Sequence, residues 1–368
     1  MILKTKRRAI AVTPRLIINT AISAVISLLP IAAACLIIAQ YRYVPNFKEF
    51  TRLDQNAPTN VWPHFVVLIT VAFYVFTFLA ALLGPKTPIL DVRLDVPGLA
   101  KWDGRRQWWE LDAGEVLRFY RRKAPLFTVA LLLLMLYDWA TLKTGILPQP
   151  FVPWPDAILN AMLRDQAMLT KAVLHSLRLL FTGYGIGVAV GIVTGIAAGW
   201  SPQVRYWVQP LTRLFGAIPP ITWVPIIVVL PMSLFRGAVL LISLAVWYPV
   251  TNTTMNGVLG IPRGVFEAAR TFGTGRFKMI FKVALPAASP FIFAGLAQGM
   301  TTACIALLIA EMMGVEAGLG VYITMQRGWA MFAEMYAAVV IIALIFFSVN
   351  SIIALIRRMA LRWAEGNT

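Results

Sequence analysis

Residues 267–286 read EAARTFGTGRFKMIFKVALP and form a polar, basic island between two long apolar runs. Basic residues stand in this stretch and just before it: Arg263, Arg270, Arg276, Lys278 and Lys282. Its apolar residues recur at spacings of three and four, which is typical of a short amphipathic helix. Gly273 permits a turn because it has no Cβ, and Pro286 suits the first position of a following helix. The stretch therefore predicts short helices around a turn, held between two apolar helices.

The composition indicates a membrane protein with several spans. Of the 368 residues, 59% are hydrophobic and only 13% are charged, and the mean hydropathy is +0.74. A net charge of +17 is compatible with nucleic-acid binding, but the basic residues cluster between apolar runs, as the positive-inside rule describes. The two cysteines, Cys35 and Cys304, both lie in apolar runs, so neither a structural disulfide nor a metal site is expected. No cleavable signal peptide is expected, because the first apolar run is long and lacks a clear cleavage site.

Apolar runs predict about eight spans in an all-α bundle. The expected spans are residues 16–40, 64–83, 126–142, 176–199, 214–235, 237–258, 287–314 and 336–356. Three further segments are expected not to cross: an amphipathic helix over 111–123, a short helix near 157–169, and a re-entrant or external piece over 316–335. Most of the 33 Lys and Arg residues then fall on one side, which predicts that both termini and the 267–286 stretch are cytoplasmic.

The polar insert 85–125 contains Trp102, Trp108 and Trp109 beside Arg105 and Arg106. Aromatic residues beside arginines suit single-stranded nucleic acid, but they also suit a membrane surface with anionic lipid headgroups. Because the insert lies between apolar spans, we expect membrane lipid as its partner and no nucleic acid.

Glycines recur every four residues in the expected span 176–199, at Gly183, Gly187, Gly191, Gly195 and Gly199. This spacing places them on one slowly drifting stripe of a helix. Such a stripe lets a second helix approach closely inside a membrane, so these residues are predicted to pack helices. Gly185 adds a Gly-x-Gly pair, but no preceding strand supports a phosphate-binding loop.

Prolines interrupt the segment 214–258, which also carries Asn252. Broken helices at membrane depth line a cavity or pack against neighbours that satisfy the freed carbonyls, so a pathway lining and simple kinked packing both stay open. Arg178 and Glu311 also fall in expected spans, where charges are costly and mark functional or paired groups. Arg178 has three interpretations: it attracts an anionic solute, it pairs with Glu311, or it reaches outward to the interface. His175 is interpreted as structural or interfacial, since no second histidine or thiolate stands at metal spacing.

The island resembles the EAA loop of bacterial ABC importer permeases. Six residues fall at the positions of that motif, namely Glu267, Ala268, Ala269, Gly273, Leu285 and Pro286, while Val283 replaces an isoleucine. The plainer alternative is an ordinary amphipathic loop between spans. Further segments resemble the nitrate, sulfonate and bicarbonate (taurine-type) branch: LPQP at 147–150, HSLR at 175–178, IPPITWVP at 218–225, AEMMG at 310–314 and GLG at 318–320.

The resemblance implies a type I ABC importer permease domain over residues 126–368, with a coupling loop at 263–286 that docks on cytoplasmic ATPase subunits. Residues 1–125 would be an N-terminal extension with two spans and a cytoplasmic insert. It further implies a multi-pass protein of the bacterial inner membrane, a homodimer with a second permease copy, and a substrate-binding protein that sets the solute. No cofactor is expected in this chain, because no Walker motif is present; ATP and Mg belong to the partner subunits.

Three alternatives lead to other functions. A membrane enzyme is disfavoured, because only His64 and His175 are available and no nucleophile elbow appears. A non-transporting scaffold or channel would not need the EAA loop. Within the importer class, a permease for another small organic solute remains the alternative to an anion permease.

Overall fold

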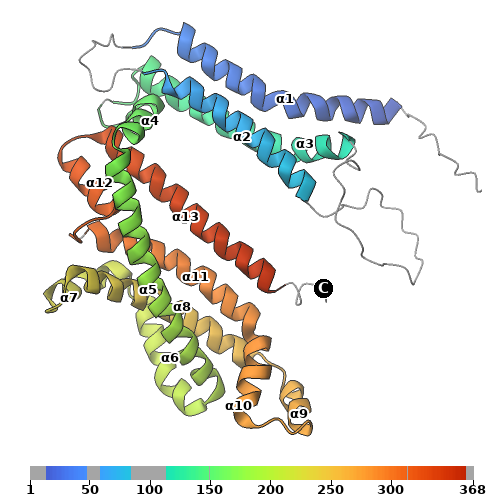
Figure 1. Ribbon diagram of the computed structural model, residues 1–368, viewed down its shortest axis with the longest axis vertical. Coiled ribbons are helices and arrows are strands. Elements are labelled where there is room, and N and C mark those ends of the chain that lie inside the picture. The colour runs from blue at the N-terminus through green and yellow to red at the C-terminus, as the bar shows by residue number, and fades with distance from the viewer. Residues whose placement is uncertain (1–13, 48–58, 84–112, 149, 313, 362–368) are drawn as a thin grey trace, which may run out of the picture. The chain divides into compact units, whose positions relative to one another are not determined.

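The computed structural model of the chain describes residues 14–47, 59–83, 113–148, 150–312 and 314–361. Within these ranges every regular element is a helix (Figure 1). Among the described residues, seven helices are long and apolar enough to cross a membrane, or up to eight if one bent helix pair counts as a span. The prediction of an all-α bundle with about eight spans is confirmed.

The chain divides into two compact units, Met1–Asn160 and Ala161–Thr368. The boundary that we expected near residue 125 came from the family resemblance, not from compactness, and it stays a prediction. Each unit has its own packed helices and is described by itself.

The first unit consists of long helices and the start of a shorter one: α1 (Pro14–Tyr43), α2 (Val61–Leu83), α3 (Ala113–Asp138) with a π-helical turn at Trp139–Lys143, and the start of α4 (Pro155–Arg164). Two buried charges hold helix ends. Asp156 accepts the backbone N–H groups of Thr59 (2.5 Å) and Trp62 (2.8 Å) at the start of α2. The ammonium group of Lys143 donates to backbone carbonyls near the end of α1, where a cation suits the unpaired C=O groups.

Helix α3 corrects one expectation. A separate helix over 111–123 followed by a span from residue 126 is wrong, because α3 runs through Pro125 without a break. Proline removes one backbone hydrogen bond, and a helix in a membrane can tolerate this where its neighbours compensate. The tryptophan-bearing part of the insert, residues 85–112, lies outside the described residues.

The second unit contains the remaining elements in chain order: α5 (Gln166–Trp200), α6 (Pro202–Ala217), the 3-10 turn Pro220–Trp223, α7 (Val224–Val229), α8 (Leu234–Leu259), α9 (Arg263–Thr271), α10 (Arg276–Met279), the π-helical turn Ile280–Ala284, α11 (Leu285–Met312), α12 (Leu319–Gly328) and α13 (Phe332–Ala360). Helix α8 packs against both α5 and α11 (Figure 1). Their buried aliphatic side chains, among them Leu180, Ile242, Val246, Met300 and Leu307, form the core of this unit.

The glycine stripe of α5 lies against α8. A Cβ added at Gly183, Gly187, Gly191, Gly195 or Gly199 would come within 3.0 Å of a side chain on α8: Ile242, Val246, Val250, Thr254 and Val258 respectively. Each successive glycine thus faces the residue one turn further along α8, and the two backbones approach as closely as the stripe permits. In lipid, where burial of apolar groups gives little drive for association, such close packing holds helices together.

The proline-rich segment differs from a single span over 214–235, and that expectation is wrong. Helix α6 already begins at Pro202 and ends at Ala217, and the following Pro220–Val229 helices are bent from it by 99°. Ile218 and Pro219 at the break have extended backbone, because each of them precedes a proline, which disfavours helical backbone in the residue before it. The predicted interruption by Pro219 and Pro220 is therefore present, but it turns the chain through about a right angle.

The stretch before α11 also differs from expectation. Pro286 does not begin a new helix, because the helical chain is continuous from Arg276 to Met312. The π-helical turn at Ile280–Ala284 stands before it, and the N–H of Leu285 donates five residues back to the carbonyl of Ile280. A π turn is wider than an α turn, so the proline ring that follows is accommodated without ending the helix.

Candidate functional site

The predicted coupling residues lie on a helix–turn–helix at one end of the second unit. Glu267, Ala268 and Ala269 occupy the middle of α9, and the chain then turns at Gly273 into α10. Figure 1 shows α9 and α10 at the lower edge of the molecule, beyond the long helices α8 and α11. The other two motif residues, Leu285 and Pro286, belong to the start of α11 and not to the turn.

Gly273 closes α9 by its backbone conformation. Its φ of +70° lies in the left-handed region, which costs other residues about 1–2 kcal/mol. The Thr274 N–H donates to Ala269 O (3.2 Å) and the Gly273 N–H to Arg270 O (2.9 Å), which is the hydrogen-bond pair of a Schellman cap. Nothing lies within 4 Å of a Cβ built on Gly273. The glycine is therefore needed for the turn itself, and not to make room for a neighbour.

The helix pair has one anchored face and one free face. Phe266 packs edge-on against Trp200, with ring centroids 5.8 Å apart, and joins a small core with Val258 and Ala288. In contrast, three aromatic side chains are left outside the core of the second unit: Phe272 is 87% exposed, Phe277 80% and Phe281 65%. Exposed aromatic residues in a cluster mark an interaction surface.

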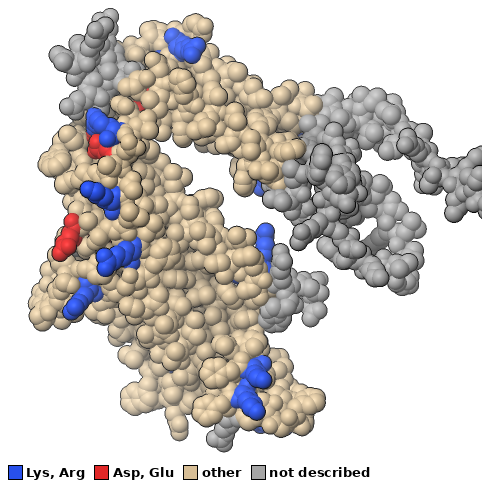
Figure 2. Space-filling model, in the orientation of Figure 1, with Lys and Arg blue, Asp and Glu red and all other residues tan. Residues whose placement is uncertain are grey.

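Basic residues surround these phenylalanines. Arg263, Arg270, Lys278 and Lys282 are all exposed, and Figure 2 shows Lys and Arg side chains gathered at the end that carries α9 and α10. Glu267 is exposed as well. The surface therefore combines large apolar groups with charges, as protein–protein contact surfaces do.

Glu311 is part of a buried polar clamp and does not pair with Arg178. Its side chain is 1% exposed; it accepts Ser176 Oγ (2.5 Å) and the Gly320 N–H (2.8 Å). Ser176 Oγ in turn accepts the N–H of Leu319 (2.9 Å). This carboxylate therefore ties α5 and α11 to the first turn of α12, whose unpaired N–H groups favour a negative charge.

The other two predicted polar residues stand apart from the clamp. The guanidinium carbon of Arg178 lies 5.5 Å from the ring centroid of Phe235, in a cation–π contact, and its side chain is exposed. Asn252 is exposed on α8. The structure thus brings neither residue to Glu311, and the pairing interpretation of Arg178 is not the arrangement found.

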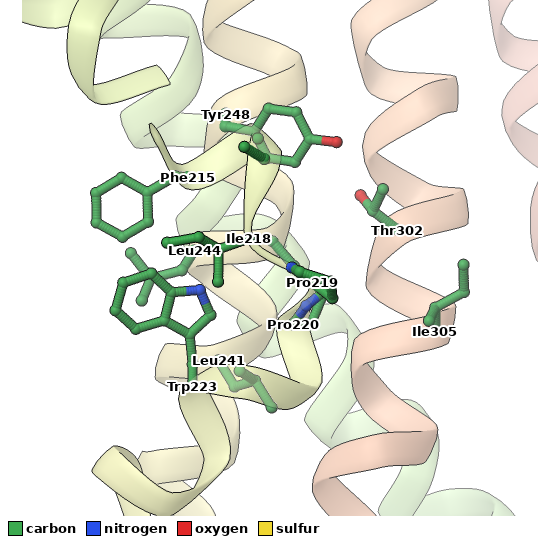
Figure 3. Close-up of a pocket in the computed structure, with 13 residues that line it drawn as sticks. Phe215, Ile218, Pro219, Pro220, Trp223, Leu241, Leu244, Tyr248, Thr302 and Ile305 are labelled. Carbon is green, nitrogen blue, oxygen red and sulfur yellow. The ribbon is translucent and has the colours of Figure 1, made fainter. Parts of the chain in front are cut away.

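A cavity of about 170 Å³ lies at the break between α6 and the Pro220–Trp223 turn, and α8 and α11 complete its wall (Figure 3). Thirteen residues line it: Phe215, Gly216, Ala217, Ile218, Pro219, Pro220, Trp223, Leu241, Leu244, Ala245, Tyr248, Thr302 and Ile305. None of these lining residues is charged. Arg178, Asn252 and Glu311 are not among them, so the polar groups selected from sequence do not identify this cavity.

Aromatic packing fixes one side of the cavity. Phe215 stacks on Trp223 with centroids 5.1 Å apart and meets the edge of Trp247 at 5.6 Å. Trp247 Nε1 donates to Thr194 Oγ1 (3.1 Å), which orients its ring against α5. Figure 3 shows Thr302 and Ile305 projecting from the opposite helix, α11. The sequence pointed to the proline break but not to this lining, because its residues come from segments that are far apart in the chain: α6 with the Pro220–Trp223 turn, α8 and α11.

A comparison with protein-family models finds a match for the larger part of the second unit. Residues 187–364 match the sequence model of the family described as "Binding-protein-dependent transport system inner membrane component". The match begins within α5, so the whole of the first unit lies outside it.

Curated relatives are similar to this chain over about half to two thirds of its length. The taurine transport system permease protein TauC of Escherichia coli (strain K12) is 28% identical over 64% of this chain and 89% of its own length. The bicarbonate transport system permease protein CmpB of Synechocystis sp. (strain ATCC 27184 / PCC 6803 / Kazusa) is 27% identical over 66% of this chain and 85% of its own length. SsuC of Bacillus subtilis (strain 168), whose name assigns it to aliphatic sulfonate transport, is 29% identical over 49% of this chain and 66% of its own length.

Solved structures resemble the chain more distantly. An inward-facing form of the MetNI methionine ABC transporter covers 54% of this chain and 98% of its own, with 20% identity and a TM-score of 0.47. An amino acid ABC transporter with histidines covers 55% and 96%, with 18% identity and a TM-score of 0.46.

Proposed function

We propose that this chain is the permease subunit of an ATP-driven importer, because residues 187–364 match the sequence model of the family of binding-protein-dependent transport system inner membrane components. It forms the pathway for a small anionic solute of the sulfonate, taurine, nitrate or bicarbonate kind. The chain contains no Walker motif, so ATP and Mg are bound by partner ATPase subunits and this subunit is not itself an enzyme.

The observation that carries the proposal is the exposed helix pair α9–α10. It presents Phe272, Phe277 and exposed basic residues beyond the membrane-spanning helices. A lipid-facing segment would not need the charges, and a freely solvated loop would not need the phenylalanines. We therefore assign this surface to a groove on a cytoplasmic ABC ATPase.

The same helix pair is joined to the cavity by a continuous helical path. From Arg276 the chain is helical through the π turn and along α11 to Met312, and Thr302 on α11 lines the cavity. A rigid helix transmits displacement along its axis, so movement of α10 by the ATPase would shift one wall of the cavity. This is how closure of the ATPases would drive alternating access.

The remaining assembly follows from the family. We assign the subunit to the bacterial inner membrane with both termini cytoplasmic, because most basic residues then lie inside. It works as a homodimer with two ATPase subunits and receives solute from a substrate-binding protein outside. A permease for another small organic solute is the alternative within the class, and a non-transporting scaffold is the alternative outside it.

A charge reversal on α9 separates coupling from scaffolding. Glu267→Arg changes an exposed residue in the middle of α9, and Glu316→Arg changes an exposed acid between α11 and α12 as the matched control. The full chain carrying either change is co-expressed with its ABC ATPase, and the ATPase retained by the permease is measured. We expect Glu267→Arg to lose the ATPase and Glu316→Arg to retain it. Equal retention in both variants would refute the coupling assignment, whereas a permease that never retains an ATPase would favour the scaffold.

A further inference from the structure

The cavity at the α6 break has the size of a site for a small hydrocarbon group. Its volume of about 170 Å³ resembles that of an apolar cavity of about 150 Å³ in another protein, which stays dry and binds benzene. The cavity is not a gap between mobile loops, since α6, α8 and α11 supply most of its wall.

The lining offers almost nothing to an ionic group. Its side-chain polar groups are the hydroxyls of Tyr248 and Thr302 and the indole N–H of Trp223, and Thr302 Oγ1 already donates to the carbonyl of Gly299 (2.9 Å). An anion that entered fully would exchange its hydration for aliphatic and aromatic carbon, which is strongly unfavourable without a paired charge. Hydrocarbon, in contrast, gains free energy by leaving water for such a surface.

The shape of the cavity is set before any ligand arrives. A Cβ on Gly216 would meet the ring of Tyr248 at 3.0 Å, so the glycine gives that ring its place at the wall. Figure 3 shows the hydroxyl of Tyr248 directed toward α11, where Thr302 lies. With Phe215 stacked on Trp223, the walls are rigid side chains on helices, as is usual for small-molecule sites.

We propose that this cavity binds the hydrocarbon part of an organic anion while the charged group stays outside it. The inference rests on the proposed transport function and narrows it: among the anions above, the pathway favours an alkyl or aryl sulfonate over nitrate, bicarbonate or taurine. Taurine is disfavoured because its ammonium group would occupy the place of a terminal methyl, and no acidic residue lines the cavity to pair with it.

The test measures ligand binding to the full chain in lipid nanodiscs by ligand-observed NMR, with empty nanodiscs to subtract partitioning into lipid. The probes are methane-, propane- and pentanesulfonate, with nitrate and taurine for comparison. We expect affinity to rise about fourfold per added methylene until the cavity is full. Propanesulfonate should bind on the order of tenfold or more tightly than taurine, which has the same number of heavy atoms.

Two variants locate the binding. Thr302→Phe fills the cavity from α11, whereas Thr301→Phe places the same ring on the next residue, which is exposed and does not line the cavity. Both lose a hydroxyl bond to their own helix. We expect only Thr302→Phe to abolish the dependence on chain length.

Affinity that is independent of chain length, or that falls equally in both variants, would overturn the inference. Because these measurements need neither ATP nor a partner, such a result would leave the coupling role of α9 untouched. Conversely, if the wild-type permease retained no ATPase, that result would refute the importer assignment and would leave the ligand-binding measurements unaffected.

Discussion

Replacing Gly187 with alanine should force α5 and α8 apart. The added Cβ would lie 2.7 Å from the backbone oxygen of Ser243 and 2.7 Å from Val246 Cβ. Non-bonded carbon atoms prefer about 3.5–4.0 Å, and a backbone oxygen cannot rotate away as a flexible side chain can. The helices must therefore separate by up to about 1 Å, and overpacking of this kind costs about 1–3 kcal/mol.

A second glycine on α5 provides the matched control. Gly185 lies two residues before Gly187 on the same helix, and nothing stands within 4 Å of a Cβ built on it. Gly185→Ala should therefore be neutral or stabilising by up to about 1 kcal/mol, because alanine favours a helix more than glycine does. The predicted difference in unfolding free energy between the two variants is about 1–3 kcal/mol, because both gain the same helix preference of alanine and only Gly187→Ala is overpacked.

Cys304 supplies the assay. It is buried in the core formed by α5, α8 and α11, whereas the other cysteine, Cys35, is exposed. In a Cys35→Ser background, a fluorogenic thiol reagent would report the exposure of Cys304 during denaturation. We expect Gly187→Ala to react at a lower temperature and lower denaturant concentration than Gly185→Ala. If the two variants unfold together, the close approach of α5 and α8 does not stabilise the protein.

Three further outcomes are expected. Gly273→Ala should speed backbone hydrogen exchange in α9 about 5–30-fold, the equivalent of 1–2 kcal/mol, and Gly275→Ala, whose φ is not positive, should leave it unchanged. Glu311→Gln should lower the unfolding free energy by about 1–3 kcal/mol in the thiol assay, because an amide nitrogen cannot accept one of the buried N–H or O–H bonds. Burial and the hydrogen bond to Asp165 raise the pKa of Tyr322. The unfolding free energy should therefore fall as the pH rises above the unfolded-state tyrosine pKa of about 10, and it should fall less in Tyr322→Phe. An equal fall in the wild-type protein and in Tyr322→Phe would contradict this.

The features that sequence predicted well depend on neighbouring residues. Apolar length identified the spans, and the glycine spacing identified the packing face of α5. The prediction of a turn at Gly273 needed only the absence of a Cβ, and its φ of +70° agrees. In each case the physical cause lies within a few residues of the pattern that reveals it.

Two predictions that relied on single prolines were wrong. Pro125 and Pro286 were each expected to separate helices, yet α3 and the segment from Arg276 to Met312 continue through them. One proline removes only one hydrogen bond, and packing against neighbouring helices can outweigh that loss. At Pro219–Pro220, by contrast, two consecutive prolines restrict two residues in a row, Ile218 and Pro219, and the chain bends by 99°.

The polar residues and the cavity depended on distant partners. Glu311 was selected because a buried charge is costly, but its bonds go to Ser176 and to the backbone of Gly320, neither of which its local sequence specifies. The cavity combines Phe215, Tyr248 and Thr302, which lie on different helices. A hydropathy profile treats such residues as ordinary components of apolar spans. It measures the transfer of each side chain out of water and carries no information on which residues line a common cavity. A charged residue in a span therefore identifies a clamp as readily as a transport site, whereas an uncharged cavity for the carbon part of a solute has no counterpart in local sequence.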